Sequence, residues 1–278
     1  MLKMLAARCG VDVLRAKAAN GDTPAHLAAQ QGHIAALEHL AAVLGDEALT
    51  APRNDGWTPA HQAAFGGHVP VLKMLAARCG VDVLRAKAAN GDTPAHLAAQ
   101  GAHVAALEHL AAVLGDEALT APRNDGWTPA HLAAFGGHVP VLKMLAARCG
   151  VDVLRAKAAN GDTPAHLAAQ KGHIAALEYL GDVLGDETLT AGTQTTHAPP
   201  RLRATSPRSR CLRRCAASTS CAPRPDDGTT VAHFAAAANG HIAVLEHLAS
   251  RARRRGADGA ADQRRPDPCA PGSVWRPR

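Results

Sequence analysis

The tetrapeptide TPAH recurs every 35 residues, and this period limits how the chain can fold more than any other feature. The five copies cannot each bury a core of their own, so units of this size stack on their neighbours and form an elongated array. The period therefore predicts a repeat solenoid. It argues against an enzyme, because nearly every reactive residue type occupies a repeated position. The copies begin at Thr23, Thr58, Thr93, Thr128 and Thr163.

Longer segments of the sequence are repeated exactly at twice this period. Residues 2–30 recur unchanged at 72–100 and 142–170, so the unit of identity is a block of 70 residues that contains two related units. We call those that read Asn-Gly-Asp-Thr-Pro first-type units and those that read Asp-Gly-Trp-Thr-Pro second-type units. Identity over such lengths indicates tandem duplication of the two-unit block.

Each unit reads as a turn followed by two short helices. A glycine two residues before the threonine suits the turn, and the Thr-Pro step suits a helix N-cap and the first helical residue. Gly32 and its equivalents then end the first helix in the left-handed region. The third unit reads Gly101-Ala102, so its glycine is displaced by one residue and we expect strain in that turn. A second helix follows, with leucines at helical spacing.

These residues resemble the ankyrin repeat, whose pattern is G-x-TPLH-x-AA-x-x-GH followed by a leucine-rich second helix. The resemblance covers residues 20–190 and part of 227–250. It implies an all-α ankyrin-repeat solenoid of stacked helix–turn–helix units with short β-turn fingers. The chain departs from the family in having alanine, as at Ala25, where leucine is usual. Alanine buries less apolar area, so we expect a fold that is less stable than a leucine-rich array.

The resemblance also gives the repeated histidines a structural role, in which the Thr hydroxyl and the His ring brace each other and the neighbouring loop. Fifteen of the sixteen histidines occupy repeated positions, and only His197 lies outside the pattern. We therefore expect no catalytic residue, no metal site and no cofactor. The bracing pairs are Thr23 with His26, Thr58 with His61, Thr93 with His96, Thr128 with His131, and Thr163 with His166.

The positions that alternate between the two unit types are the candidates for recognition. In ankyrin arrays the residue before Thr-Pro lies at the finger tip, and the end of the first helix shares its concave face, where partners bind. Aromatic side chains are enriched at binding hot spots. The alternative is that the tryptophan packs on the adjacent finger and the phenylalanine fills space beside small neighbours. The candidates are Trp57, Trp127, Asp22, Asp92, Asp162, Phe65, Phe135, Gln30, Gln100 and Gln170.

The charge of the chain changes abruptly after residue 190. Residues 1–190 hold 7 Lys, 8 Arg and 18 Asp or Glu, whereas residues 191–278 hold 15 Arg, no Lys and 6 acids. Arg-rich stretches are typical of nucleic-acid-binding tails. A second hypothesis is that they are repeat units translated out of frame. Residues 216–224 (AASTSCAPR) can be coded by the bases for CGVDVLRAK read one position later, and residues 258–278 match the repeat in the same way.

The predicted function is recognition of an unidentified protein partner on the concave face, without catalysis. The alternatives are nucleic-acid binding through the Arg-rich segments and a non-functional gene product with a folded core. We expect a monomer in the cytoplasm, with the nucleus as the alternative, and no membrane association. We expect residues 1–19 to fray and the chain to be a fragment of a longer array. The predicted segments are a truncated half-unit at 1–19, an ankyrin array of about five units at 20–190, an irregular insert at 191–226, a partial unit at 227–250 and a disordered Arg-rich tail at 251–278.

Overall fold

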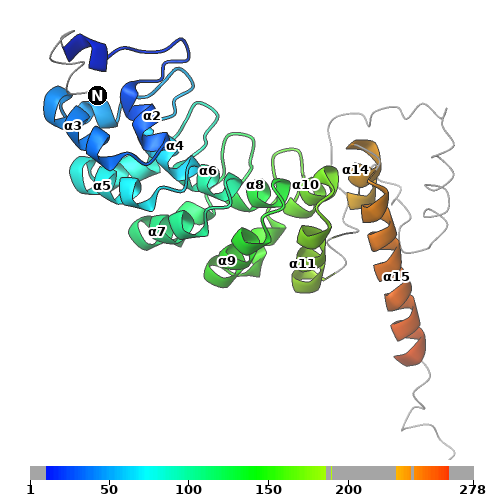
Figure 1. The fold of residues 1–278 in the computed structure, drawn as a ribbon. Coiled ribbons are helices and arrows are strands. Elements are labelled where there is room, and N and C mark those ends of the chain that lie inside the picture. Colours follow the sequence, from blue (N-terminus) through cyan, green and yellow to red (C-terminus); the bar gives the residue numbers. More distant parts are fainter. Residues whose placement is uncertain (1–10, 186–188, 190–229, 239–240, 263–278) are drawn as a thin grey trace, which may run out of the picture.

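The computed structural model describes residues 11–185, 189, 230–238 and 241–262, and its regular elements within these ranges are all helical (Figure 1). Short first helices alternate with longer second helices, as the period predicts. The all-α solenoid is therefore confirmed. The first helices are α2 (Pro24–Gln30), α4 (Pro59–Phe65), α6 (Pro94–Gln100), α8 (Pro129–Phe135) and α10 (Pro164–Lys171). The second helices are α3 (Ile34–Leu44), α5 (Val69–Cys79), α7 (Val104–Leu114), α9 (Val139–Cys149) and α11 (Ile174–Leu184).

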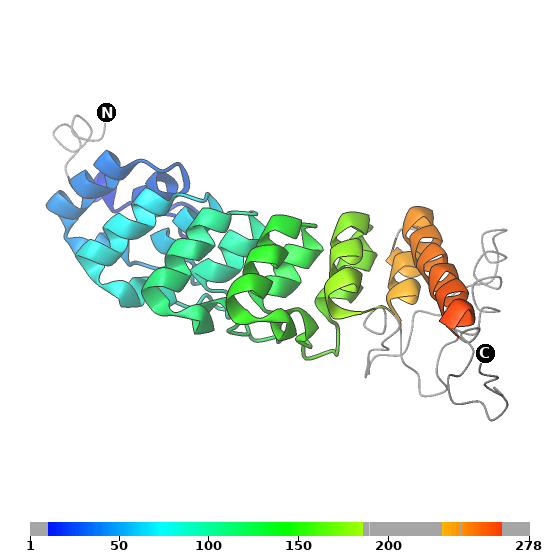
Figure 2. The ribbon, with the colours of Figure 1, turned by 90° about the horizontal axis from the view of Figure 1, so that it is seen from below.

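The helices form two rows. Each first helix packs against the next first helix, from α2 through α4, α6 and α8 to α10, and also against the second helix of its own unit. Figure 1 shows the fingers rising from the row of first helices, on the side toward which the array curves. Figure 2, turned by 90°, shows the same units following one another along a single axis. We call the surface made by the fingers and the first helices the concave face.

The sequence signals for the ends of the first helices act as predicted. Thr58, the N-cap of α4, has an extended backbone with φ −105° and ψ 169°, and Pro59 takes the first helical position. Gly67 turns the chain toward α5 with φ +72°. Ala102 stands at the equivalent position of the third unit with φ +62°, the one positive φ of a non-glycine residue in the described ranges. The expected strain is therefore present, because a side chain costs roughly 1 kcal/mol in this region.

A short 3₁₀-helix precedes each described finger, and the sequence pattern did not predict it. The helix of the first unit is followed by Gly45, whose φ of +90° reverses the chain, and the 3₁₀ turn then buries Leu49 completely. The turns from the second to the fifth each follow a second helix and lead into the next finger. In chain order, the turns are η1 (Val11–Leu14), η2 (Asp46–Leu49), η3 (Val81–Arg85), η4 (Asp116–Leu119) and η5 (Val151–Arg155).

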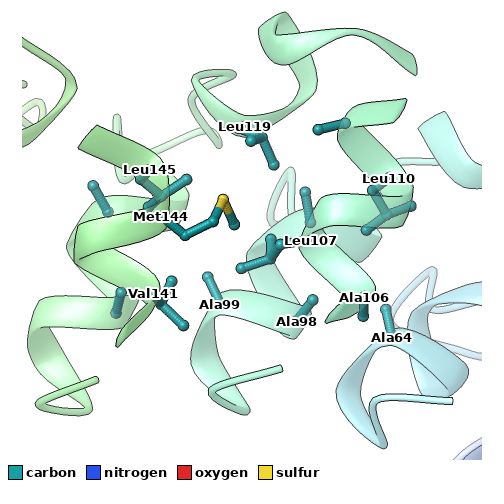
Figure 3. Packing of buried hydrophobic residues seen from close by; sticks show 14 of the residues in the cluster. Ala64, Ala98, Ala99, Ala106, Leu107, Leu110, Leu119, Val141, Met144 and Leu145 are labelled. Carbon is teal, nitrogen blue, oxygen red and sulfur yellow. The ribbon is translucent and has the colours of Figure 1, made fainter. Parts of the chain in front are cut away.

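Alanines and leucines share the core. Ala98 and Ala99 of α6 are fully buried, and their small side chains let the neighbouring helices approach closely. Figure 3 shows them beside Leu107 of α7, with Val141 and Leu145 of α9 across the same cluster. The alanine of each TPAH step is buried as well, so the narrow alanine positions lie inside the stack.

One polar side chain interrupts this core. Gln62 of α4 is only 3% exposed, and its Oε1 has no hydrogen-bond partner. The equivalent residue of α8 is Leu132, which is buried in the same place. An unsatisfied buried amide costs about 1–3 kcal/mol. The unit that contains Gln62 therefore packs less favourably than the equivalent unit that contains Leu132.

Beyond α11 the described chain resumes in α14 (Val231–Ala238), which packs directly on α10, and continues in α15 (Ile242–Asp262). The prediction of a disordered tail is wrong for residues 251–262, which extend α15. Alanine and arginine favour helix, and no proline occurs there before Pro266. Arg251 anchors this stretch with an ion pair to Asp182 at 2.9 Å. Residues 1–10 of the half-unit at 1–19, the whole insert at 191–226 and the tail beyond 262 lie outside the described residues.

Candidate functional site

The fingers of the concave face are joined to one another by main-chain hydrogen bonds. Asn54 donates its N–H to the carbonyl of Asn20 (3.2 Å), and its side-chain amide donates to the carbonyl of Ala19 (3.0 Å). The next finger continues the ladder, because Ala89 donates its N–H to the carbonyl of Asp55 at 2.9 Å. The fingers therefore form one continuous support rather than independent loops.

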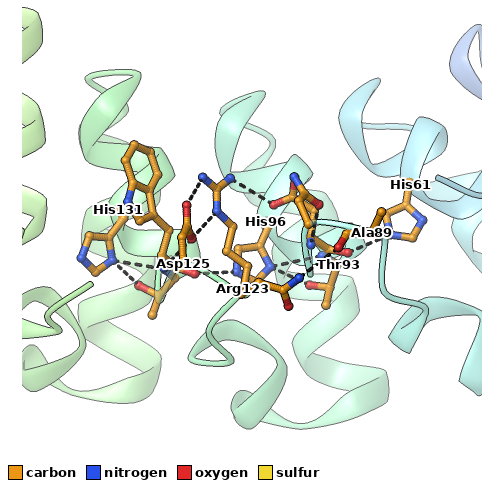
Figure 4. Close-up of polar contacts among 12 residues, drawn as sticks. His61, Ala89, Thr93, His96, Arg123, Asp125 and His131 are labelled. Carbon is orange, nitrogen blue, oxygen red and sulfur yellow. Dashed lines mark hydrogen bonds and ion pairs between the residues drawn. The ribbon is translucent and has the colours of Figure 1, made fainter. Parts of the chain in front are cut away.

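In the first four TPAH steps the histidine ties its own turn to the following finger. In the first unit the N–H of Thr23 donates to Nδ1 of His26 at 3.2 Å, and Nε2 lies 2.9 Å from the carbonyl oxygen of Trp57. A main-chain N–H can only donate, so Nδ1 is the acceptor and Nε2 carries the proton. The Thr23 hydroxyl also lies 2.9 Å from Nδ1. Figure 4 shows the same arrangement at His96 and His131.

This arrangement requires a neutral ring. Burial lowers the pKa of His61 and of His131 to about 4, although their hydrogen bonds to the next finger oppose the shift. Burial lowers the pKa of His26 and His96 as well. Protonation of Nδ1 would place its N–H opposite the main-chain N–H of the threonine, and two donors cannot form a hydrogen bond. The connection between turn and finger therefore holds only while the ring is neutral.

From the second unit to the fifth, the histidine that precedes the second helix makes the opposite connection. His68 lies with Nε2 2.8 Å from the carbonyl oxygen of Gln30, and His103 makes the same contact with Phe65, also at 2.8 Å. The bonds therefore run back to the end of the preceding first helix. One histidine of a unit bonds forward and the other bonds back, which fixes the spacing of neighbouring units on the concave face.

An aromatic cluster stands on this support in each second-type unit. The Trp57 ring stacks on His61, with centroids 6.3 Å apart and planes at 19°, and lies 6.1 Å from the Phe65 ring. Arg53 lies over the indole, with its Cζ 4.4 Å from the ring centroid. Trp57 is half-buried, whereas Phe65 is 38% exposed. The cluster is therefore both packed within its unit and open to solvent.

The second copy of this cluster has nearly the same geometry. Trp127 lies 5.6 Å from Phe135 and 6.3 Å from His131, and Arg123 sits 4.7 Å from the indole centroid. One addition distinguishes it, because Nζ of Lys171 lies 4.2 Å from the centroid of Phe135. Cation–π contacts of this kind contribute roughly 0.5–1 kcal/mol at exposed sites.

Arg53 and Arg123 were missed as site residues in the sequence, although each directly precedes the Asn-Asp-Gly-Trp tip. Arg53 donates to both oxygens of Asp55 at 2.7 Å and reaches Asp22 of the preceding finger at 3.3 Å. These hydrogen bonds lower the pKa of Asp55. The arginine therefore orients the tryptophan and joins two fingers at once, and its recurrence only in second-type units was the available signal.

The structure separates the predicted aspartates from the aromatic candidates. Asp92 and Asp162 are 4% and 5% exposed, and the Asp92 carboxylate pairs with Arg123 inside the finger stack. Asp22 is half-buried and pairs with Arg53 in the same way. The carboxylates of Asp22 and Asp92 face the neighbouring finger, and that of Asp162 is buried, so we leave all three out of the proposed contact surface.

Asp162 lacks the partner that the other two have. Its Oδ1 is buried without a hydrogen bond, and burial raises its pKa. The position equivalent to Arg53, counted back from the threonine of the next TxAH step, is Pro225 in the sequence. Proline has no guanidinium group, so the sequence offers no counterpart of Arg53 at that position.

The glutamines lie near the ends of the first helices of the first-type units, so they alternate with the aromatic clusters along the array. Gln100 is exposed, and Gln30 and Gln170 are half-buried. The main-chain carbonyls of Gln30 and Gln100 accept the histidine bonds, while no side-chain hydrogen bond is formed by these amides among the described residues. They therefore leave amide groups available on the concave face.

Two kinds of site are missing from the part of the chain that the structure describes. It contains no group of three or more His, Cys, Asp or Glu side chains that could hold a metal ion. None of the helices in those same ranges combines the length and the apolar character needed to cross a membrane.

Comparison with known proteins adds a match over the first two thirds of the chain. The family model described as ankyrin repeats in three copies matches residues 1–87, 78–157 and 115–190. The search of curated proteins gave no match to this chain.

Proposed function

Because the chain belongs to the ankyrin repeat family, whose members generally mediate protein–protein interactions, we propose that it binds a protein partner through its concave face and performs no catalysis. The partner contacts the two aromatic clusters, Trp57 with Phe65 and Trp127 with Phe135, together with the amides of Gln30, Gln100 and Gln170. We further propose that it acts as a monomer in the reducing cytoplasm. The free thiols of Cys79 and Cys149 support that compartment.

The observation that carries this proposal is the exposure of an ordered aromatic pair. Phe65 leaves 38% of its surface to solvent beside a tryptophan that is fixed by three neighbours. A side chain that is already ordered loses little conformational entropy when a partner binds. Packing of Trp57 within its own unit therefore supports binding, because it prepares the surface that a partner would cover.

Affinity capture with the full-length chain and its variants tests the proposal. The test variant combines Trp57→Ala with Trp127→Ala, and the control variant changes Lys73→Ala and Glu108→Ala on exposed positions of second helices. Proteins identified by mass spectrometry should bind wild type and control and should be lost from the test variant. Circular dichroism verifies that all three are folded. Retention of the same proteins by the test variant would refute the role of the aromatic clusters.

The Arg-rich segments favour nucleic acid as a second candidate, since 15 arginines lie after residue 190. Binding to duplex or single-stranded nucleic acid would weaken steeply as salt rises. Truncation after residue 190 would abolish it, whereas protein binding through the concave face would survive the same truncation.

A further inference from the structure

The 70-residue period gives the chain two copies of one aromatic site rather than one large patch. Residues 52–61 and 122–131 are identical in sequence, and the ring and guanidinium geometry differs between the copies by only a few tenths of an ångström. Both copies belong to the same stack of fingers and first helices, so their separation is fixed by the units between them.

This separation can be converted into a length of peptide. Trp57 and Trp127 lie two units apart, and α4 contacts α6, which contacts α8. Packed helices lie 8–10 Å apart, so the two sites are roughly 16–20 Å from each other. An extended peptide rises about 3.3 Å per residue, so five to six residues cover this distance.

The surface between the two sites is polar. The third unit has the buried Asp92 where its neighbours have tryptophan, and it ends its first helix with the exposed Gln100. The exposed Lys87 lies on its finger. A peptide that lies across both sites therefore passes the side chains of Gln100 and Lys87 midway, and polar residues suit its central part.

The two sites differ in charge. Lys171 brings an ammonium group over Phe135, whereas the residue at the equivalent position beside Phe65 is Gly101. The structure gives Lys171 and Lys87 no ion pair with any described carboxylate. The second site therefore has a positive charge without an ion-pair partner among the described residues, whereas the arginine of the first site is paired with Asp55 and Asp22.

We propose that the partner presents an extended segment with two bulky apolar side chains about six residues apart and an acidic residue beside the one that occupies the Trp127 site. This inference rests on the proposed function and narrows it to one kind of ligand. The two anchors bind as one bivalent ligand. Once the first anchor has bound, the second meets its site at a high effective concentration.

Synthetic peptides test this directly on the full-length chain. The probe has two tryptophans six positions apart in a Ser/Asn background, with one glutamate next to the second tryptophan. Single-anchor peptides replace either tryptophan by serine, and a spacing series places the tryptophans three, six, nine and twelve positions apart. A further peptide carries the glutamate next to the first tryptophan. It tests the case in which the peptide binds along the array in the opposite N-to-C direction.

We expect fluorescence anisotropy to show at least about tenfold tighter binding of the six-spaced peptide than of either single-anchor peptide, with weaker binding at spacings of three and twelve. Trp57→Ala or Trp127→Ala should reduce its affinity to the single-anchor level. Lys171→Gly, which copies the first site, should remove the advantage of the glutamate and leave the advantage of the second tryptophan. Circular dichroism verifies that each variant is folded.

The outcomes separate this inference from the proposed function. Equal affinity for single- and two-anchor peptides would overturn the two-site ligand. Loss of partner capture by the double tryptophan variant, together with no binding of any peptide, would leave the proposed function in place and overturn the inference. Partner capture that is unaffected by the double variant, with no peptide binding, would overturn both.

Discussion

At the scale of single residues, two aspartates at equivalent positions of the repeat lie in different environments. Asp92 and Asp162 lie in identical first-type sequences and are equally buried, and each is held by the side-chain amide of the asparagine two residues earlier. Asp92 also faces a guanidinium from the next finger at 3.4 Å, whereas Oδ1 of Asp162 faces none. A buried charge without a counter-ion is unfavourable, so these two positions contribute differently to stability.

The pair predicts opposite effects of one substitution. Asp92→Asn removes the ion pair with Arg123 and should lower the free energy of unfolding by about 1–3 kcal/mol. Asp162→Asn removes an unpaired buried charge and should be neutral or stabilising. The midpoint of urea unfolding measures both. An equal loss in the two variants would show that the ion pair is not what distinguishes the sites.

At the scale of elements, the turn between the two helices of a unit demands a left-handed backbone. Glycine meets this demand in four of the five complete units, and Ala102 meets it in the third with φ +62°. Space is limited as well, since a Cβ built on Gly137 would lie 2.6 Å from Nδ1 of His173. The third turn therefore carries strain that the others avoid.

Ala102→Gly should relieve this strain and raise the free energy of unfolding by roughly 1 kcal/mol. The reciprocal variant, Gly137→Ala, should lose more than that, because the new Cβ must also displace the His173 ring. Thermal unfolding followed by circular dichroism compares the two. A third turn that gains nothing from glycine would mean that its backbone is relaxed despite the positive φ.

The elements also show how far the sequence determines the structure. The helix ends were predictable because Thr-Pro and the turn glycines act locally. The 3₁₀ turns were not, since four residues such as those at 46–49 are too short to carry a period. Burial of Asp92 and the bridging role of Arg123 depend on contacts between residues 31 positions apart, which no local pattern records. The helix at 251–262 depends on docking of Arg251 onto α11.

At the scale of the whole molecule, histidines join every complete unit to its neighbours, and this makes the array sensitive to acid. His61 and His131 have a pKa of about 4 in the fold and 6.5 when unfolded, so the unfolded chain binds more protons between these values. The stabilisation is therefore complete above pH 6.5 and is lost as the pH falls toward 4. Each ring contributes up to about 3 kcal/mol, at 1.36 kcal/mol per pKa unit.

We expect the thermal midpoint of the full-length chain to fall steadily from pH 7 to pH 5, where carboxylates are still largely ionised. His61→Asn should be less stable than wild type at pH 7 and should lose less on acidification. Differential scanning calorimetry at pH 7, 6 and 5 measures both effects. A midpoint that is constant across this range would contradict the assignment of neutral bridging rings.

The identity of the 70-residue blocks has a consequence for how such a chain changes over generations. Removing residues 72–141 would join Val71 to Leu142, and the new junction would have the same sequence as the old one. Unequal recombination between the blocks of the gene can therefore lengthen or shorten the array in steps of two units, and the two unit types still alternate across the junction. Each step also adds or removes one aromatic site, so the number of anchors that a partner must supply can evolve without a new kind of unit.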